Sequence, residues 1–403
     1  MKRLKKFSRD KELLSTLPQN EYYESVSSGL GIVQVVLYLS LLAFVVLSFL
    51  RNTDLITYRN FYYFIKDLNA SAKTVNVWNT DSVSYPTDDK QSFALYRKGL
   101  AVAGNNSVTV FTATGRQSIS QSISYRNPVA VGTGKYLLVY DLGGTEYSLY
   151  NSYTQIFSGE TDYPISGAAV SESGTYALIT EASEINSVVT LYNSSFERKS
   201  AYPKKGYVMD VAISSDGEQI AMVTSTVANG SFHTELTVCK VGEKTERAKL
   251  KISDSLALSC IFTEKNTVSV LCSGGVYTFT ADGKRLGSHG FGGDTVAAYA
   301  ITDSGIAVAL KTLGTSEKKH ILVFDKHGEL ICNENAPKQV DAMVRQGDTV
   351  YLQTAYSVIK LDVNTRKFTE RICQTAQRKI LAVSESEILL CSPQKAVYLN
   401  FDS

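Results

Sequence analysis

Few residues of this chain have the types and spacing that catalysis requires. Among 403 residues there are only four histidines, and none lies in a G-x-S-x-G or H-E-x-x-H motif. Hydrolysis would need a nucleophile, a base and an orienting group. His320 and His327 bracket one expected strand and lie near its opposite ends, so they cannot share a metal ion. We therefore predict no catalytic residue, no metal site and no cofactor.

Tyrosine and proline recur together where one repeat of the sequence passes to the next. Proline fixes a corner of the backbone and tyrosine can pack on it, which would staple neighbouring repeats together. The alternative is an aromatic rim that stacks on a sugar or a peptide. The pairs are Tyr85-Pro86, Tyr163-Pro164 and Tyr202-Pro203, and Tyr125 with Pro128 nearly repeats them. The candidate binding rim comprises Tyr85, Tyr125, Tyr163, Tyr202, His233 and His320.

Three expected loops on the same rim are longer than a turn requires. Long loops on a rigid scaffold usually carry binding residues, although tolerated insertions have the same length. The sequence leaves these alternatives open. The loops are Glu181–Ser187, Ser225–Thr234 and Lys311–His320.

Six cysteines lie in the C-terminal half of the chain. Their expected strand positions do not face one another, so we predict buried apolar side chains rather than disulfide bridges. They are Cys239, Cys260, Cys272, Cys332, Cys373 and Cys391.

A repeat of roughly 40 residues positions all of these groups. From about residue 91 onward each unit contains an inner strand, a second strand, a third strand and an outer strand. One small sheet cannot bury both of its faces alone, whereas several arranged radially can, which predicts a β-propeller. The second strands are expected at Leu100–Ala103, Tyr136–Tyr140, Tyr176–Thr180, Gln219–Thr224, Thr267–Cys272, Gly305–Leu310, Thr349–Thr354 and Glu387–Cys391.

The ends of the repeat predict how the ring closes. Turns such as Ser214–Gly217 place a glycine where a tight hairpin needs a positive φ. The last unit supplies only three strands before the chain stops, so its outer strand is expected from the segment 74–78, TVNVW. This closure removes an exposed sheet edge. We predict an all-β, eight-bladed propeller, with seven blades as the fallback.

An apolar run precedes the propeller. Leu30–Leu50 has no charged residue, and as a helix it would span about 31 Å, the thickness of a bilayer core. The run is longer than the apolar core of a cleaved signal peptide. Lys and Arg residues precede it, which favours a cytoplasmic N-terminus. We expect a basic cytoplasmic tail at 1–29, a transmembrane helix at 30–50, a juxtamembrane segment at 51–73 and the propeller at 74–403.

Two segments resemble known propeller repeats. VAISSDGEQIAMV at Val211–Val223 resembles WD-repeat-like bacterial propellers, and GVYTFTADGKRL at Gly275–Leu286 resembles quinoprotein-type propellers. The whole chain resembles bacterial single-pass proteins with an external propeller of unassigned function. The Trp-Asp signature is missing, so the WD-repeat partner-binding residues are not carried over. Trp78 is the single tryptophan and no vicinal cysteines occur, which disfavours a quinone cofactor.

These observations predict a binding protein of the cell envelope. The expected function is a membrane-anchored, extracytoplasmic and non-catalytic propeller that binds a protein or an envelope polymer. The net charge of +2 argues against nucleic acid as a partner. The alternative is an envelope enzyme, glycoside hydrolase-like or quinoprotein-like, which would use a carboxylate pair at the channel mouth. The acids expected near that mouth are Asp88, Asp89, Asp162 and Asp210.

Overall fold

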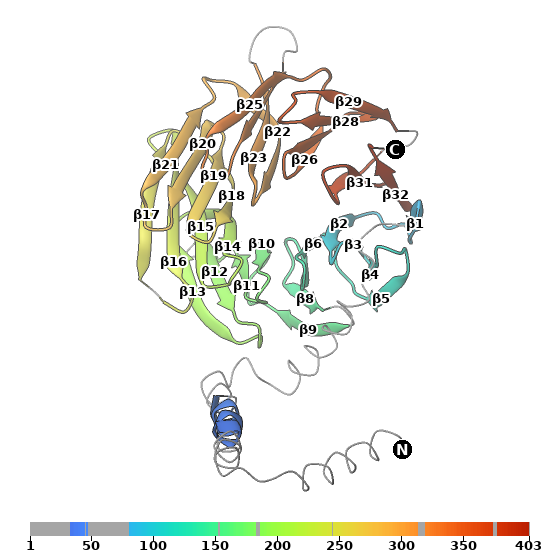
Figure 1. The fold of residues 1–403 in the computed structure, drawn as a ribbon. Coiled ribbons are helices and arrows are strands. Elements are labelled where there is room, and N and C mark those ends of the chain that lie inside the picture. Colours follow the sequence, from blue (N-terminus) through green and yellow to red (C-terminus); the bar gives the residue numbers. More distant parts are fainter. Residues whose placement is uncertain are drawn as a thin grey trace, which may run out of the picture. The chain divides into compact units, whose positions relative to one another are not determined.

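A computed structural model describes residues 33–44, 46, 80–151, 154–182, 186–243, 245–312, 319–373 and 377–402. The chain divides into two compact units, Met1–Ser71 and Ala72–Ser403. In the first unit, residues 33–44 and 46 are helical (Figure 1). Their side chains are exposed. No described helix is both long and apolar enough to cross a membrane. The rest of the predicted membrane segment, the basic tail and the segment 51–73 lie outside the described residues.

The second unit is an eight-bladed β-propeller, as predicted, and the seven-bladed fallback is wrong (Figure 1). Each blade is a four-stranded antiparallel sheet whose strands follow one another from the inner to the outer position. The first four blades are β2 (Gln91–Tyr96), β3 (Gly99–Gly104), β4 (Ser107–Phe111) and β5 (Gln117–Ser122); β6 (Pro128–Gly132), β7 (Leu137–Asp141), β8 (Glu146–Tyr150) and β9 (Gln155–Glu160); β10 (Ile165–Val170), β11 (Tyr176–Thr180), β12 (Ser187–Tyr192) and β13 (Arg198–Lys204); β14 (Tyr207–Ile213), β15 (Gln219–Ala228), β16 (Ser231–Lys240) and β17 (Glu246–Ser253).

The remaining blades continue this order around the ring. They are β18 (Ala257–Glu264), β19 (Thr267–Cys272), β20 (Gly275–Thr280) and β21 (Arg285–Gly290); β22 (Thr295–Thr302), β23 (Gly305–Lys311), β24 (Lys319–Phe324) and β25 (Leu330–Asn335); β26 (Ala342–Gln346), β27 (Thr349–Gln353), β28 (Ser357–Asp362) and β29 (Phe368–Ile372); β30 (Lys379–Ala382), β31 (Glu387–Cys391), β32 (Lys395–Asn400) and β1 (Ser82–Ser84).

Burial differs by position within the blade. Every residue of the second strands β3, β11, β19 and β27 is buried, because neighbouring blades cover both faces of these strands. Outer strands such as β5 bury one residue in six. Continuous apolar runs therefore mark the second strands in the sequence, and all eight lie where the repeat predicts them.

The N-terminal part of the propeller closes the ring. β1 pairs with β32 in antiparallel register, Val83 opposite Ala396, and so completes the eighth blade. We expected this outer strand at 74–78, which lies outside the described residues, so the position in the sequence is corrected. The reason is the length of the connections: each outer strand joins the next inner strand through two to six residues. A strand ending at residue 78 would leave twelve before β2.

The strand directions give the propeller two distinct faces. Inner strands begin, second strands end, third strands begin and outer strands end at one edge of every blade. This edge also carries the connections between blades, and we call it the crossing face. The opposite edge carries the turns after the inner and third strands, and we call it the turn face. The chain enters the propeller at the turn face, where Thr80 packs beside Gly115 of the first blade.

One of the three long loops is instead a β-hairpin. We expected a loop at Ser225–Thr234, but β15 and β16 pair without interruption up to Ala228 and Ser231. Asn229 and Gly230 form the two-residue turn, and both have positive φ, 52° and 78°. This is the type I′ geometry that Asn-Gly favours. Residues 183–185 and 313–318 of the other two loops lie outside the described residues.

The cysteines follow the prediction from the sequence. All six are free, and all but Cys373 are buried. Cys272 lies opposite Ala257 and Cys260 lies opposite Val270, so neither of these cysteines faces another. Burial raises the pKa of the Cys272 thiol to about 12, so these thiols pack as small apolar groups.

Candidate functional site

Two of the four predicted rim tyrosines, Tyr85 and Tyr125, are buried in connections and link neighbouring blades. Tyr85 follows β1 and packs against Phe93 of the first blade, with ring centroids 5.8 Å apart. Its hydroxyl donates a hydrogen bond to the backbone carbonyl of Ser392 in the eighth blade at 2.7 Å. Tyr125 joins the first two blades, and its hydroxyl donates to Ser148 Oγ at 3.2 Å. Both rings are 7% exposed and therefore cannot form a stacking surface.

The other predicted rim residues have separate environments. Tyr202 is buried within β13, and its hydroxyl donates to the backbone carbonyl of Glu243 in the fourth blade at 3.0 Å. His233 in β16 and His320 in β24 are half-buried strand residues near the crossing face. Tyr163 is 47% exposed and lies in the connection between the second and third blades. The structure therefore leaves one of the four tyrosines available for contact.

The four aspartates do not form one site. Asp88 and Asp89 lie between the eighth and first blades, and Asp162 lies between the second and third. Asp210 is on β14, next to a register shift at Val208, and both of its carboxylate oxygens accept hydrogen bonds.

Asp210 links two blades rather than facing a partner carboxylate. Its Oδ2 atom accepts from Ser259 Oγ at 2.6 Å and from the backbone N–H of Cys260 at 3.0 Å, both on β18. Burial raises the pKa of Asp210, and these hydrogen bonds oppose the shift. In the described part of the chain, no group of histidine, cysteine, aspartate and glutamate side chains could hold a metal ion.

Exposed apolar side chains gather instead at the crossing face. In the described propeller, twelve large apolar side chains are strongly exposed, and eight of them lie at this edge. Six lie on the second and fourth blades and in the connection between the second and third blades, and we call these six the apolar patch. It comprises Leu142, Tyr163, Tyr207, Met209, Val227 and Phe232. The other two are Tyr356 and Ile372 of the seventh blade.

The hairpin of the fourth blade supplies the most exposed part of the apolar patch. Val227 lies directly opposite Phe232 across the hairpin, and they are 67% and 48% exposed. Ser225 and Thr234, two pairs further down, are buried, and Thr234 Oγ1 donates to the backbone carbonyl of Ser255 at 2.8 Å. The base of the hairpin is thus fixed against the fifth blade while its tip stands in solvent. The Asn-Gly dipeptide is the feature of the sequence from which this hairpin could have been predicted.

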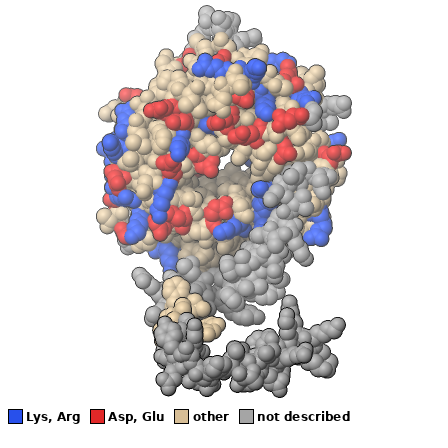
Figure 2. Space-filling view, viewed as in Figure 1, with Lys and Arg blue, Asp and Glu red and all other residues tan. Residues whose placement is uncertain are grey.

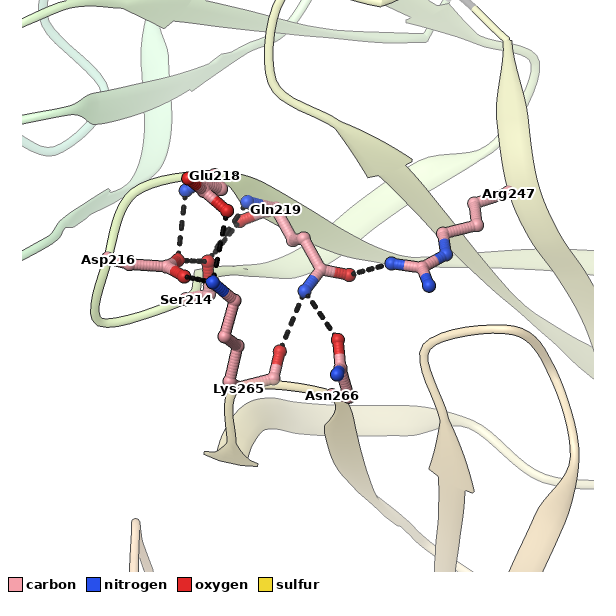
Figure 3. Close-up of polar contacts among 7 residues, drawn as sticks. All are labelled: Ser214, Asp216, Glu218, Gln219, Arg247, Lys265 and Asn266. Atoms are coloured by element: carbon pink, nitrogen blue, oxygen red, sulfur yellow. Dashed lines mark hydrogen bonds and ion pairs between the residues drawn. The ribbon is translucent and has the colours of Figure 1, made fainter.

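The turn face is occupied by polar contacts between blades. Figure 3 shows them between the fourth and fifth blades, where Lys265 Nζ lies 2.7 Å from Asp216 Oδ2 and 3.1 Å from Glu218 Oε2. The Gln219 amide donates to the backbone carbonyl of Lys265 at 2.8 Å and accepts from Arg247 at 2.8 Å. Other neighbouring blades are also joined by hydrogen bonds from a side chain to a backbone carbonyl. These bonds join Tyr96 and Lys135, Thr263 and Lys326, and Tyr351 and Ser384.

Asp216 predicts an acid-sensitive contribution to stability. Although partial burial opposes ionisation, hydrogen bonds from Lys265, Ser214 and the backbone N–H of Glu218 lower its pKa from 3.8 to about 2. A lowered pKa stabilises the folded state above about pH 4, and this contribution is lost as the pH falls towards 2.

We therefore expect the Asp216→Asn variant to be less stable than the wild type near neutral pH. The difference should shrink below about pH 4 and vanish only below about pH 2, because the wild-type carboxyl group is then mostly protonated. Urea midpoints of both proteins at several pH values measure this. A difference that stays constant down to the lowest pH would contradict it.

The surface charge does not favour a polyanion. Figure 2 shows Lys and Arg interspersed with Asp and Glu on the face in view, around a hollowed centre. The net charge of the whole chain is only +2. A nucleic-acid site would require a basic stripe.

Solved structures with the same fold differ widely in sequence. Sqt1 of Chaetomium thermophilum, bound to the N-terminus of the ribosomal protein L10, is 12% identical with a TM-score of 0.57, covering 80% of this chain and all of that chain. BamB of Moraxella catarrhalis is 10% identical with a TM-score of 0.54, covering 80% and 99%. The C-terminal WD40 domain of Sif2 is 13% identical with a TM-score of 0.57, covering 80% and 97%. At such identities these matches show the propeller fold alone.

The sequence itself matches one family. A comparison with curated proteins gave no match. The model of a family of unknown function (DUF5711) matches residues 71–398, which is most of the chain. The chain therefore belongs to the DUF5711 family.

Proposed function

We propose that this propeller is a non-catalytic binding module whose apolar patch contacts a protein partner. One observation carries the proposal: exposed apolar side chains concentrate at the crossing face, whereas polar contacts between blades occupy the turn face. Apolar and aromatic side chains at the centre of a contact supply most of the binding energy of protein interfaces. The BamB and WD40 propellers share the fold, and Sqt1 is a propeller solved with a bound protein segment.

A membrane tether is the second part of the proposal. The charge-free run Leu30–Leu50 supports it, as does the helix at 33–44, where Leu37 and Phe44 are 64% and 68% exposed. Apolar side chains around a whole helix suit lipid better than water. The basic residues before the run then favour a cytoplasmic N-terminus and an extracytoplasmic propeller. Envelope polymers are a further class of partner for the same face.

The tether is tested by fractionation of intact cells. The full chain should stay with the membrane after alkaline carbonate extraction and be released by detergent. A chain that begins at Thr80 should be recovered without detergent. Recovery of the full chain in the carbonate supernatant would reject the membrane tether. It would not affect the proposal that the apolar patch binds a partner.

The apolar patch is tested with matched charge substitutions. We expect the Val227→Asp/Phe232→Asp double variant to lose at least about 2 kcal/mol of partner binding, roughly a thirty-fold weaker affinity, because both side chains stand at the centre of the contact. Photo-crosslinking in intact cells identifies the partner, and titration with the purified partner measures the affinity.

Leu286 and Ile331 provide the control for this experiment. They are 42% and 37% exposed and lie near the turn face, so Leu286→Asp/Ile331→Asp adds the same charge at the other edge. This control should keep wild-type binding. If the control loses the partner and the hairpin variant keeps it, the binding face is the turn face and the proposal fails.

A further inference from the structure

The tip of the fourth-blade hairpin has the features of a spontaneous chemical modification site. Asn229-Gly230 is the single Asn-Gly dipeptide in the sequence. Both residues are exposed and form the two-residue turn between Ala228 and Ser231. Asn-Gly sequences are susceptible to deamidation because glycine has no side chain to hinder attack by its own backbone nitrogen.

The local geometry leaves the reacting groups accessible. In a type I′ turn the hydrogen bond joins the residues that flank the turn, so the N–H of Gly230 is not needed to hold it. Among the described residues, no hydrogen bond involves the Asn229 side chain or the Gly230 N–H. A Cβ atom built on Gly230 would have no neighbour within 4 Å, so the surroundings of the turn are open.

We infer that Asn229 is a deamidation site, and that the modification changes the surface of the apolar patch with time. The deprotonated backbone nitrogen of Gly230 attacks Cγ of Asn229 and forms a new C–N bond. The bond between Cγ and the side-chain nitrogen breaks, and that nitrogen leaves as ammonia after taking up a proton. Water then opens the cyclic imide at either carbonyl, which gives aspartate or isoaspartate without any change of oxidation state.

Both products alter the exposed tip. Each places a new carboxylate two residues from Val227 and three from Phe232. Isoaspartate also adds a carbon to the backbone of a two-residue turn, so it cannot keep the register that sets Val227 opposite Phe232. Under the proposed function, which this consequence assumes, modified molecules should bind the partner less tightly.

The same protein contains an internal comparison, an asparagine whose side chain is held by hydrogen bonds. Asn193 precedes Ser194, and its side chain is held in place: Oδ1 accepts from the backbone N–H groups of Ser195 and Glu197 at 3.1 and 2.8 Å. Its amide nitrogen donates to the Glu197 carboxylate at 3.1 Å. A side chain fixed in this way cannot turn its carbonyl carbon towards the following nitrogen.

The test follows purified full-length protein in detergent, incubated at mildly alkaline pH and digested for mass spectrometry. We expect the Asn229 peptide to gain the mass of deamidation several-fold faster than the Asn193 peptide, with isoaspartate detected by enzymatic methylation. Conversion should be faster at higher pH, because the attacking nitrogen must lose its proton. The Asn229→Gln protein should show no conversion at this position, since its longer side chain closes the ring much more slowly.

One result would overturn the inference. If the folded protein converts Asn229 no faster than Asn193 while urea-unfolded protein converts it rapidly, the turn protects the site. This measurement does not involve a partner, so it is independent of the proposed function. Binding by the Asn229→Asp variant then tests the consequence separately.

Discussion

A chain that begins at Pro86 should lose at least about 5 kcal/mol of folding stability relative to one that begins at Thr80. The shorter chain lacks β1, and with it the buried side chains of Val83 and Tyr85. Burial of a tyrosine contributes about 3–5 kcal/mol and that of a valine about 2 kcal/mol. The whole domain is stabilised by only about 5–15 kcal/mol. Most of the shorter chain is therefore expected to be unfolded or open at the eighth blade.

Both chains can be compared by urea unfolding and by protection from protease. Cleavage of the shorter chain should begin around β32, because removal of β1 leaves this strand as an unpaired edge. The chain from Thr80 serves as the control, since it also lacks residues 1–79. Equal urea midpoints would show that β1 does not stabilise the propeller.

The fold could be predicted from the sequence because one strand in each blade has an unmistakable composition. Second strands such as β19 are buried on both faces, so they require continuous apolar residues. The turn glycines gave the register: Gly217 has the positive φ, 74°, that the Ser214–Gly217 turn requires. Eight such units in phase leave little choice of architecture.

The closing strand could not be located in this way. β1 has the sequence Ser-Val-Ser, and only Val83 is buried, so it contains no apolar pattern. The segment 74–78 alternates better, so its sequence predicts a strand more strongly than that of β1. The short connection to β2 decides the matter instead, and connection lengths are known only once the neighbouring strands are in place.

The candidate site was harder to predict than the fold. Tyr85 and Tyr125 lie in connections between blades, as predicted, whereas Tyr202 lies within the outer strand β13. Composition does not show whether a tyrosine packs inward or outward. Val227 and Phe232 have the alternation of a half-buried strand. They are exposed only because the hairpin of β15 and β16 extends beyond the neighbouring strands. How far it extends depends on the residue at which β14 begins.

Replacement of Arg345 by alanine should reduce the free energy of unfolding by about 3–5 kcal/mol. Its side chain is 3% exposed at the junction of the sixth and seventh blades. Nη1 donates to the backbone carbonyl of Phe324 at 2.6 Å and Nε donates to that of Gly347 at 2.9 Å. Alanine would leave a cavity and two carbonyl groups without their donor.

Arg345→Met separates the two contributions to this loss. Methionine fills most of the volume, so the remaining cost, about 1–3 kcal/mol per unsatisfied carbonyl, reports the hydrogen bonds alone. Arg345→Lys keeps the charge but cannot reach both carbonyls with a planar pair of donors, and it should fall between wild type and alanine. Burial already lowers the pKa of Arg345, so the site offers little solvation to a cation that loses its partners. If Arg345→Ala lowers the free energy of unfolding by less than about 1 kcal/mol, water has replaced the guanidinium between the sixth and seventh blades. Arg345 then does not join these blades.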